Sequence, residues 1–166
     1  MLHKMSGKRG KIRERKIGIQ YLLMALFICF LDQLSKFWVT KALEIGESIS
    51  MVKGIFHITL VHNRGAAFGM LRQHPYLFVA VAAISAIFIA GLILLRPHKL
   101  TPAQKTALCF ILGGALGNLT DRIRLGYVVD FIDFRIWPVF NLADSFITVG
   151  AVMMGVLILR KKRCTG

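Results

Sequence analysis

Four long apolar stretches divide the chain, separated by segments rich in charged and polar residues. A bilayer core of roughly 30 Å takes about 20 mostly apolar residues of helix to cross, and lipid offers no partner to an unpaired backbone amide. The stretches therefore predict four transmembrane helices, at about 17–38, 75–95, 104–122 and 140–159. The expected fold class is an all-α transmembrane four-helix bundle, forming a single domain over residues 1–166.

The longest connecting segment, about 39–74, is polar and rich in residues that favour β-structure. β-Branched residues recur between Ile49 and Val61, and glycines interrupt them. We expect a small extracytoplasmic β-cradle here, inserted between the first and second helices. Residues 55–68 are expected to close over the functional groove and limit water, as lids commonly do.

Lysine and arginine collect in the N-terminal tail, the loop at 96–105 and the C-terminal tail, which explains the net charge of +14. An even number of spans places these segments on one side, and the positive-inside rule assigns that side to the cytoplasm. Both termini are therefore expected to be cytoplasmic. Beside membrane helices, the expected partner of these basic segments is anionic membrane lipid and not nucleic acid.

Acidic residues are few and unevenly placed. Of eight, seven fall in the outer half of a span or in the two outer loops. Ionisable groups at membrane depth are costly and indicate a functional interior. Asp32 and Lys36 lie one helical turn apart, where a structural ion pair and a direct role at the site are equally good interpretations. Asp133 is expected to be a surface acid.

The third apolar stretch combines small residues with a polar group. Gly113 and Gly117 form the small-xxx-small pattern that lets membrane helices approach closely. Asn118, Asp121 and Arg122 follow at a spacing that places them on one helical face. Arg122 is expected to act as an ion-pair strut and not as a substrate contact.

The fourth stretch begins with a polar stripe at helical spacing, made of Asn141, Asp144, Ser145 and Thr148. Inside a membrane such a stripe must face protein or water. Asp130 lies just upstream with apolar residues on both sides, so it is not expected to be freely solvated. Asp130 and Asp144 are therefore candidates for one shared site near the outer face of the membrane.

Two carboxylates in one site do not both ionise easily, so the pair holds one proton. The ionised partner can then activate water, and the protonated partner can hydrogen-bond a scissile carbonyl, as in aspartic peptidases. Because Asp144 lies in the first turns of a helix, the macrodipole favours it as the base and leaves Asp130 as the acid. His57, His62 and His74 lack metal-binding spacing, so neither a metal ion nor a cofactor is expected.

Several motifs, in order along residues 17–159, resemble those of the lipoprotein signal peptidase (signal peptidase II) family. They are Asp32-x-x-x-Lys36, Asn63-x-Gly65-Ala66-Ala67-Phe68, Gly113-Gly114-Ala115-Leu116-Gly117-Asn118-x-x-Asp121-Arg122, Val129-Asp130-Phe131 and Phe140-Asn141-x-Ala143-Asp144-Ser145. The resemblance implies that Asp130 and Asp144 are the catalytic dyad. It implies that the site is lined or supported by Asp32, Lys36, Asn63, Gly65, Asn118, Asp121, Arg122, Asn141 and Ala143.

The resemblance further implies an aspartic endopeptidase of the bacterial cytoplasmic (inner) membrane. Its substrate would be a diacylglyceryl-modified prolipoprotein, cut just before the lipidated cysteine, and its inhibitors would include the cyclic peptide globomycin. We expect a monomer. The family architecture adds a short amphipathic helix on the outer side. Two features depart from the family: the basic N-terminal tail is long, and the stretch between the two acids is short, which leaves the packing of residues 131–139 in question.

Two other classes would also place acids among membrane helices. A proton-coupled transporter would have helix breaks near the midplane and a polar path across the membrane. The acids gather at one face, and residues 75–95 carry no charge. A non-catalytic chaperone could bind lipoprotein precursors through the same groove. Both alternatives predict greater tolerance of Asp-to-Asn changes than a catalytic dyad allows.

Overall fold

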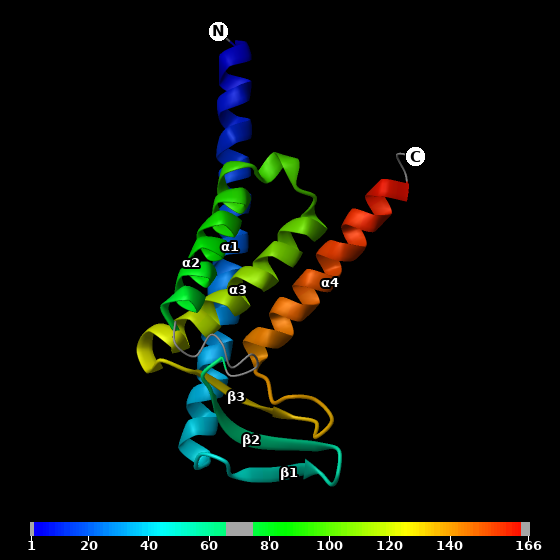
Figure 1. The fold of residues 1–166 in the computed structure, drawn as a ribbon. Coiled ribbons are helices and arrows are strands. Elements are labelled where there is room, and N and C mark those ends of the chain that lie inside the picture. The colour runs from blue at the N-terminus through cyan, green and yellow to red at the C-terminus, as the bar shows by residue number, and fades with distance from the viewer. Residues whose placement is uncertain (1, 66–74, 164–166) are drawn as a thin grey trace.

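The computed structural model describes the backbone of residues 2–65 and 75–163, which form four long helices and a small sheet (Figure 1). The helices are α1 (Leu2–Ala42), α2 (Pro75–Leu95), α3 (Pro102–Leu125) and α4 (Leu142–Arg163), with a short 3₁₀ turn, η2 (Pro97–Lys99), between α2 and α3. The strands are β1 (Ser48–Val52), β2 (Phe56–Asn63) and β3 (Val128–Asp133). Figure 1 shows the sheet at one end of the bundle and the N-terminal part of α1 projecting beyond the other end.

All four predicted helices are present, and the predicted bounds of α2 are confirmed. α3 begins where Thr101 caps it, with the Thr101 hydroxyl accepting from the Gln104 backbone amide, and ends at Gly126 in the left-handed conformation. Among the described residues, Arg15–Ala42 and Leu142–Lys161 are long and apolar enough to cross a membrane, and Val79–Leu95 is a shorter apolar stretch.

The helices turn many large apolar side chains outward, among them Leu23, Phe27, Ile84, Ile87 and Phe88, which are 58–74% exposed. At the sheet end of the bundle, the buried side chains include polar and charged ones, among them Asp32, Lys36 and Asp130. A water-soluble protein rarely shows so much apolar surface. This arrangement suits a protein surrounded by lipid.

Glycines on α3 and α4 set the distance between the helices. A methyl group added at Gly113 would lie 2.8 Å from the Ala25 carbonyl of α1, and one at Gly150 would lie 2.7 Å from the Ala107 carbonyl of α3. These contacts confirm the predicted close approach through small residues. α3 occupies the centre of the bundle and contacts each of the other three helices.

The sheet has the antiparallel order β1-β2-β3. The predicted β-structure between residues 49 and 61 is confirmed, but the sheet is not simply an insertion between the first two helices. Its third strand comes from the segment between α3 and α4, and Val61 of β2 faces Asp130 of β3. β3 is almost entirely buried, so its sequence lacks the alternation of polar and apolar residues that marks a half-buried strand.

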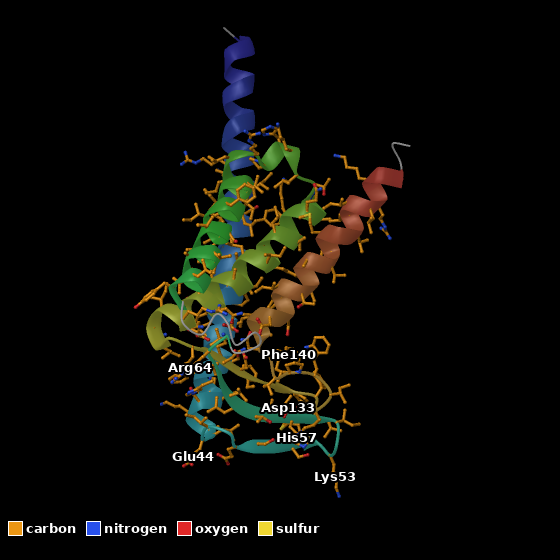
Figure 2. The ribbon with its side chains drawn as sticks, viewed as in Figure 1. Glu44, Lys53, His57, Arg64, Asp133 and Phe140 are labelled. Carbon is orange, nitrogen blue, oxygen red and sulfur yellow. The ribbon has the colours of Figure 1, made fainter. Side chains whose placement is uncertain are left out.

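The prediction that Asp133 is a surface acid is wrong, since only 5% of the residue is exposed. Its carboxylate accepts hydrogen bonds from the Thr59 hydroxyl and from the Arg135 backbone amide, each at 2.8 Å. These two bonds lower the pKa of Asp133. Figure 2 shows Asp133 within the sheet, near His57 of the neighbouring strand. Asp133 therefore braces the sheet.

The short stretch at 131–139 makes a tight return to α4. The Phe131 and Ile132 amides both donate to the Phe140 carbonyl, and the Phe140 amide donates back to Ile132. Phe140 thus lies between the sheet and the start of α4 (Figure 2). The family resemblance implies a short amphipathic helix on the outer side. In the outer loop between α1 and α2, the described residues 43–65 contain no helix, and residues 66–74 lie outside the described residues.

Candidate active site

Asp130 and Asp144 reach one site from two different elements, the strand β3 and the first turn of α4. Asn141, which directly precedes α4 and is fully buried, connects them. Its amide nitrogen donates to Asp130 Oδ1 at 2.6 Å, and its amide oxygen accepts from the Asp144 backbone amide at 2.9 Å. One capping side chain therefore holds the start of α4 against β3.

Two further asparagines orient the acids. Asn118 of α3 donates to Asp144 Oδ1 at 2.7 Å, and Asn63 of β2 donates to Asp130 Oδ2 at 2.8 Å. Asn118 and Asn141 also join each other, since the Asn118 oxygen accepts from Asn141 at 3.1 Å. The acids are thus fixed in orientation by a connected network of amides.

Asp130 is only 1% exposed, and this burial raises its pKa to about 6. The hydrogen bonds from Asn63 and Asn141 oppose the rise, while the negative charge of Asp144 adds to it. Burial and the neighbouring carboxylate therefore both favour the protonated form of Asp130.

Gly65 explains how Asn63 is aimed. The Gly65 amide donates to the Asn63 side-chain oxygen at 2.8 Å, which leaves the Asn63 nitrogen pointing to Asp130. Gly65 has φ +77, in the left-handed region that glycine occupies without strain. Residues 66–68 of the same motif lie outside the described residues.

A second group of charges lies beside the dyad and is called here the lysine cluster: Asp32, Lys36 and Asp121. Lys36 Nζ lies 2.8 Å from an oxygen of each acid, and all three residues are at most 3% exposed. Lys36 also donates to the Asn118 oxygen at 3.1 Å. Asp32 and Lys36 do form an ion pair, and the pair supports an asparagine that holds Asp144. A direct role of either residue at the site stays a prediction.

The lysine cluster also positions both elements that carry the dyad. Asp32 Oδ1 accepts from the Ala143 amide at 2.9 Å, which satisfies a free N–H in the first turn of α4. Asp121 accepts from the Val129 amide at 3.1 Å, next to Asp130 on β3. Gly117 leaves the space for this contact, because a methyl group there would lie 2.5 Å from Asp32 Oδ2.

Sequence reasoning missed Gln33. Its amide nitrogen donates to Asp121 at 2.8 Å and to the Gly117 carbonyl at 3.1 Å, so it joins α1 to α3. The sequence did contain a signal for Gln33, because it is a polar residue inside an apolar span, directly after Asp32. The predicted stripe on α4 reaches Ser145, whose hydroxyl donates to the Asn141 carbonyl, whereas Thr148 is exposed.

A cavity of about 450 Å³ opens next to the dyad. Asn63, which bonds Asp130, forms part of its wall; the other lining residues are Arg64, Tyr76, Val79, Arg122, Ile123, Gly126 and Tyr127. Arg122 also donates to the Asn118 carbonyl at 3.4 Å. Its role as a strut stays a prediction. A substrate in this cavity would lie against two guanidinium groups and several apolar side chains.

The histidines do not gather at the dyad. In the described part of the chain, no three His, Cys, Asp or Glu side chains are grouped so as to hold a metal ion. His62 stacks on the Tyr127 ring with centroids 3.9 Å apart. His57 lies on β2 opposite Asp133, and His74 is outside the described residues.

Comparison with known proteins gives consistent matches. Residues 24–160 match the model of the family described as signal peptidase (SPase) II. The lipoprotein signal peptidase of Moorella thermoacetica is 48% identical over 140 residues, covering 84% of this chain and 89% of that protein. The one from Halothermothrix orenii is 43% identical, covering 85% of this chain and 96% of that protein.

A solved structure, described as a bacterial membrane enzyme studied by the in meso method at 2.3 Å, superposes with a TM-score of 0.79. It is 29% identical to this chain and covers 89% of it, with 92% of that structure matched. A second bacterial membrane enzyme, at 1.9 Å, has a TM-score of 0.76 and 31% identity, with 84% and 92% covered. Together with the family match and the geometry above, these findings show that the chain belongs to the signal peptidase II family.

Proposed function

We propose that this membrane protease removes the signal peptide from diacylglyceryl-modified prolipoproteins by aspartic catalysis, cutting just before the lipidated cysteine, with Asp130 and Asp144 as the dyad. The observation that carries the mechanism is the bridge through Asn141, which brings a buried acid of β3 and an acid of α4 into one site. The hydrogen-bond donors to the two carboxylates include the side-chain amides of Asn63, Asn118 and Asn141 and the backbone amide of Asn141.

The environments of the two acids divide their roles. Asp130, with its pKa raised to about 6 by burial, carries the proton and donates to the scissile carbonyl oxygen. Asp144 lies at the positive end of the α4 dipole and takes a proton from the attacking water. The new carbon–oxygen bond gives a tetrahedral intermediate. Asp144 passes the proton that it took from water to the leaving nitrogen as the carbon–nitrogen bond breaks, and the proton that Asp130 donated returns to Asp130 as the carbonyl re-forms.

The amide network keeps this arrangement ready for the reaction. Asn118 holds one oxygen of Asp144 and Asn63 holds one oxygen of Asp130, so rotation of either carboxylate breaks a hydrogen bond. Such preorganisation contributes most where charge develops in a site that excludes water. Arg64, which lines the cavity, is placed to bind carbonyl oxygens of the extended substrate, while Arg122 keeps its expected role as a strut beside Asn118.

We place the protein in the bacterial inner membrane with four spans and both termini in the cytoplasm. The outward apolar side chains and the collection of lysine and arginine at the end away from the sheet support this orientation. The dyad then lies near the outer face, where the lipid chains of the substrate stay in the bilayer. The cavity beside Asn63 receives the residues around the cleavage point and, by the same chemistry, a cyclic-peptide inhibitor such as globomycin. We take the active form to be a monomer.

The expected lid needs to be narrower than residues 55–68. β2 is the central strand of the sheet and is hydrogen-bonded to β1 and β3 along both edges, so it cannot swing alone. A closing movement of residues 56–63 would have to carry the whole sheet with it. Arg64 directly follows β2 and lies close to the helices (Figure 2).

The decisive experiment is cleavage of a diacylglyceryl-modified prolipoprotein by the purified protein in detergent. We expect Asp130→Asn and Asp144→Asn each to lower turnover by about 10³-fold or more while substrate binding is kept. Asp133→Asn is the matched control, because this acid is on the same strand and buried but bonds Thr59 and Arg135 instead. It should keep activity within about threefold.

Near-normal turnover in either dyad variant would refute the assignment. An inert wild-type protein that still binds substrate would favour the chaperone alternative. Equal losses in Asp133→Asn and the dyad variants would show that the effect comes from disruption of the sheet and not from catalysis.

A further inference from the structure

A second cavity lies at the end of the bundle away from the dyad. It has a volume of about 540 Å³ and is formed by the N-terminal half of α1, the end of α2 and the turn η2; it is lined by Arg15, Ile19, Leu22, Leu94, Leu95, Pro97 and His98. Figure 1 shows η2 at the opposite end of the bundle from the sheet. The cavity is therefore separate from the proteolytic site, and the proposed mechanism does not use it.

The walls of this cavity are fixed by close packing. Gly18 of α1 approaches α2 so closely that a methyl group there would lie 2.9 Å from the Ile93 carbonyl, and Ile93 is fully buried. The η2 turn closes on itself, since the Lys99 amide donates to the Arg96 carbonyl at 3.1 Å. Gly18 and Ile93 directly precede the lining residues Ile19 and Leu94, so the cavity lies beside this close crossing of α1 and α2.

The lining has two chemical parts. Five of its residues are apolar, and two of these, Ile19 and Leu95, are 44% and 79% exposed. The other two, Arg15 and His98, are a permanent cation and an imidazole. Lys16, Arg96 and Lys99 are exposed close by along the chain. Of the eight acidic residues in the sequence, only Glu14 belongs to the end of the bundle away from the sheet.

We infer that this cavity binds one anionic phospholipid of the cytoplasmic leaflet. The guanidinium group of Arg15 pairs with the phosphate, for which its planar set of donors is suited. The upper part of an acyl chain lies against Ile19, Leu22 and Leu94. Basic pockets between membrane helices on the cytoplasmic side have the charge and shape that such head groups require. The positively charged start of a signal peptide is excluded by the same charge.

Native mass spectrometry of the full chain in detergent tests this inference. The delipidated protein is titrated with phosphatidylglycerol or with phosphatidylcholine of the same acyl chains. We expect one phosphatidylglycerol to bind with a Kd about tenfold lower than that for phosphatidylcholine. Arg15→Gln should remove most of this difference, and Ile19→Trp, which fills the apolar part, should weaken the binding of both lipids.

Lys16→Gln is the matched control, because it removes the same charge from the next residue of α1, which does not line the cavity. It should change the Kd less than about twofold. Prolipoprotein cleavage by each variant verifies that the fold is intact. Equal losses in Arg15→Gln and Lys16→Gln, equal affinity for both lipids, or displacement by inorganic phosphate alone would overturn the inference.

Discussion

The molecule holds two groups of buried carboxylates side by side, and they are stabilised in opposite ways. In the lysine cluster, one ammonium lies 2.8 Å from each of two acids. In the dyad, Asp130 and Asp144 are hydrogen-bonded by amides, which carry no charge. The two groups meet at Asn118, which accepts from Lys36 and donates to Asp144.

This difference suits the two groups to different tasks. A cation within ion-pair distance favours the charged form of a carboxyl group, so the cluster is suited to hold helices together. An amide donor orients a carboxylate but leaves its charge unbalanced, so burial acts on Asp130 and raises its pKa to about 6. Neutral donors therefore order the two acids of the dyad without pairing either one with a cation.

The largest expected effect on stability comes from removing the single cation of the cluster. Lys36→Met leaves Asp32 and Asp121 buried without their partner, which typically destabilises a protein by about 3–5 kcal/mol. Unfolding by denaturant in mixed micelles would measure the loss. Adding Asp32→Asn to Lys36→Met should restore part of it.

Lys41→Met is the control for this change. Lys41 lies near the end of the same helix, exposed, with Nζ 4.8 Å from the centre of the Phe37 ring. Its loss should cost less than about 1 kcal/mol. A Lys36→Met protein as stable as the wild type would show that the cluster needs no cation, and the contrast between the two groups would fail.

A smaller loss of stability is expected from an added side chain that crowds the lysine cluster. In Gly117→Ala, the added methyl group lies 2.5 Å from Asp32 Oδ2 and 3.3 Å from Ala143 Cβ. Overpacking of this kind costs about 1–3 kcal/mol, and here it displaces the carboxylate that caps α4.

Gly155→Ala on α4 is the matched control, since nothing lies within 4 Å of its added methyl group. It should be neutral or slightly stabilising. Equal stability of the two variants would show that the packing at Gly117 is loose.

The local parts of this design could be predicted from the sequence. The length of the apolar stretches predicted the helices. The spacing of Asn141 and Asp144 predicted that they share a face, because both lie within one helical turn. The apolar flanks of Asp130 indicated a buried acid. Each of these inferences depends on residues close together in the chain: one apolar run of about 20 residues, one helical turn, or immediate neighbours.

The contacts that make the site come from residues far apart in the chain, and spacing does not reveal them. Asp32 meets the Ala143 amide across 111 positions, and Asn63 meets Asp130 across 67. Sequence spacing shows which residues share a face but not which face they meet. β3 was missed for the related reason that a strand buried on both sides looks like a short apolar run. Asp133 was misjudged because its partners, Thr59 and Arg135, are set by strand register and by a turn.

The smallest expected effect is a change in pH dependence, and it tests the dyad directly. In the proposed mechanism Asp130 acts in its protonated form, so kcat/KM should be high below its pKa of about 6 and should fall as the pH rises through that value. The Asn63 hydrogen bond lowers this pKa, so Asn63→Ala should raise it and move the falling limb to higher pH by up to about one unit.

Thr59→Val, on the same strand, removes a bond to Asp133 and should leave the falling limb of the pH profile in place. A limb that moved to lower pH in Asn63→Ala, or moved equally in both variants, would mean that the proton is not on Asp130. An unshifted limb with reduced turnover would limit Asn63 to positioning the carboxylate, because only a group that stabilises the charged form of Asp130 can change the pH at which that proton is lost.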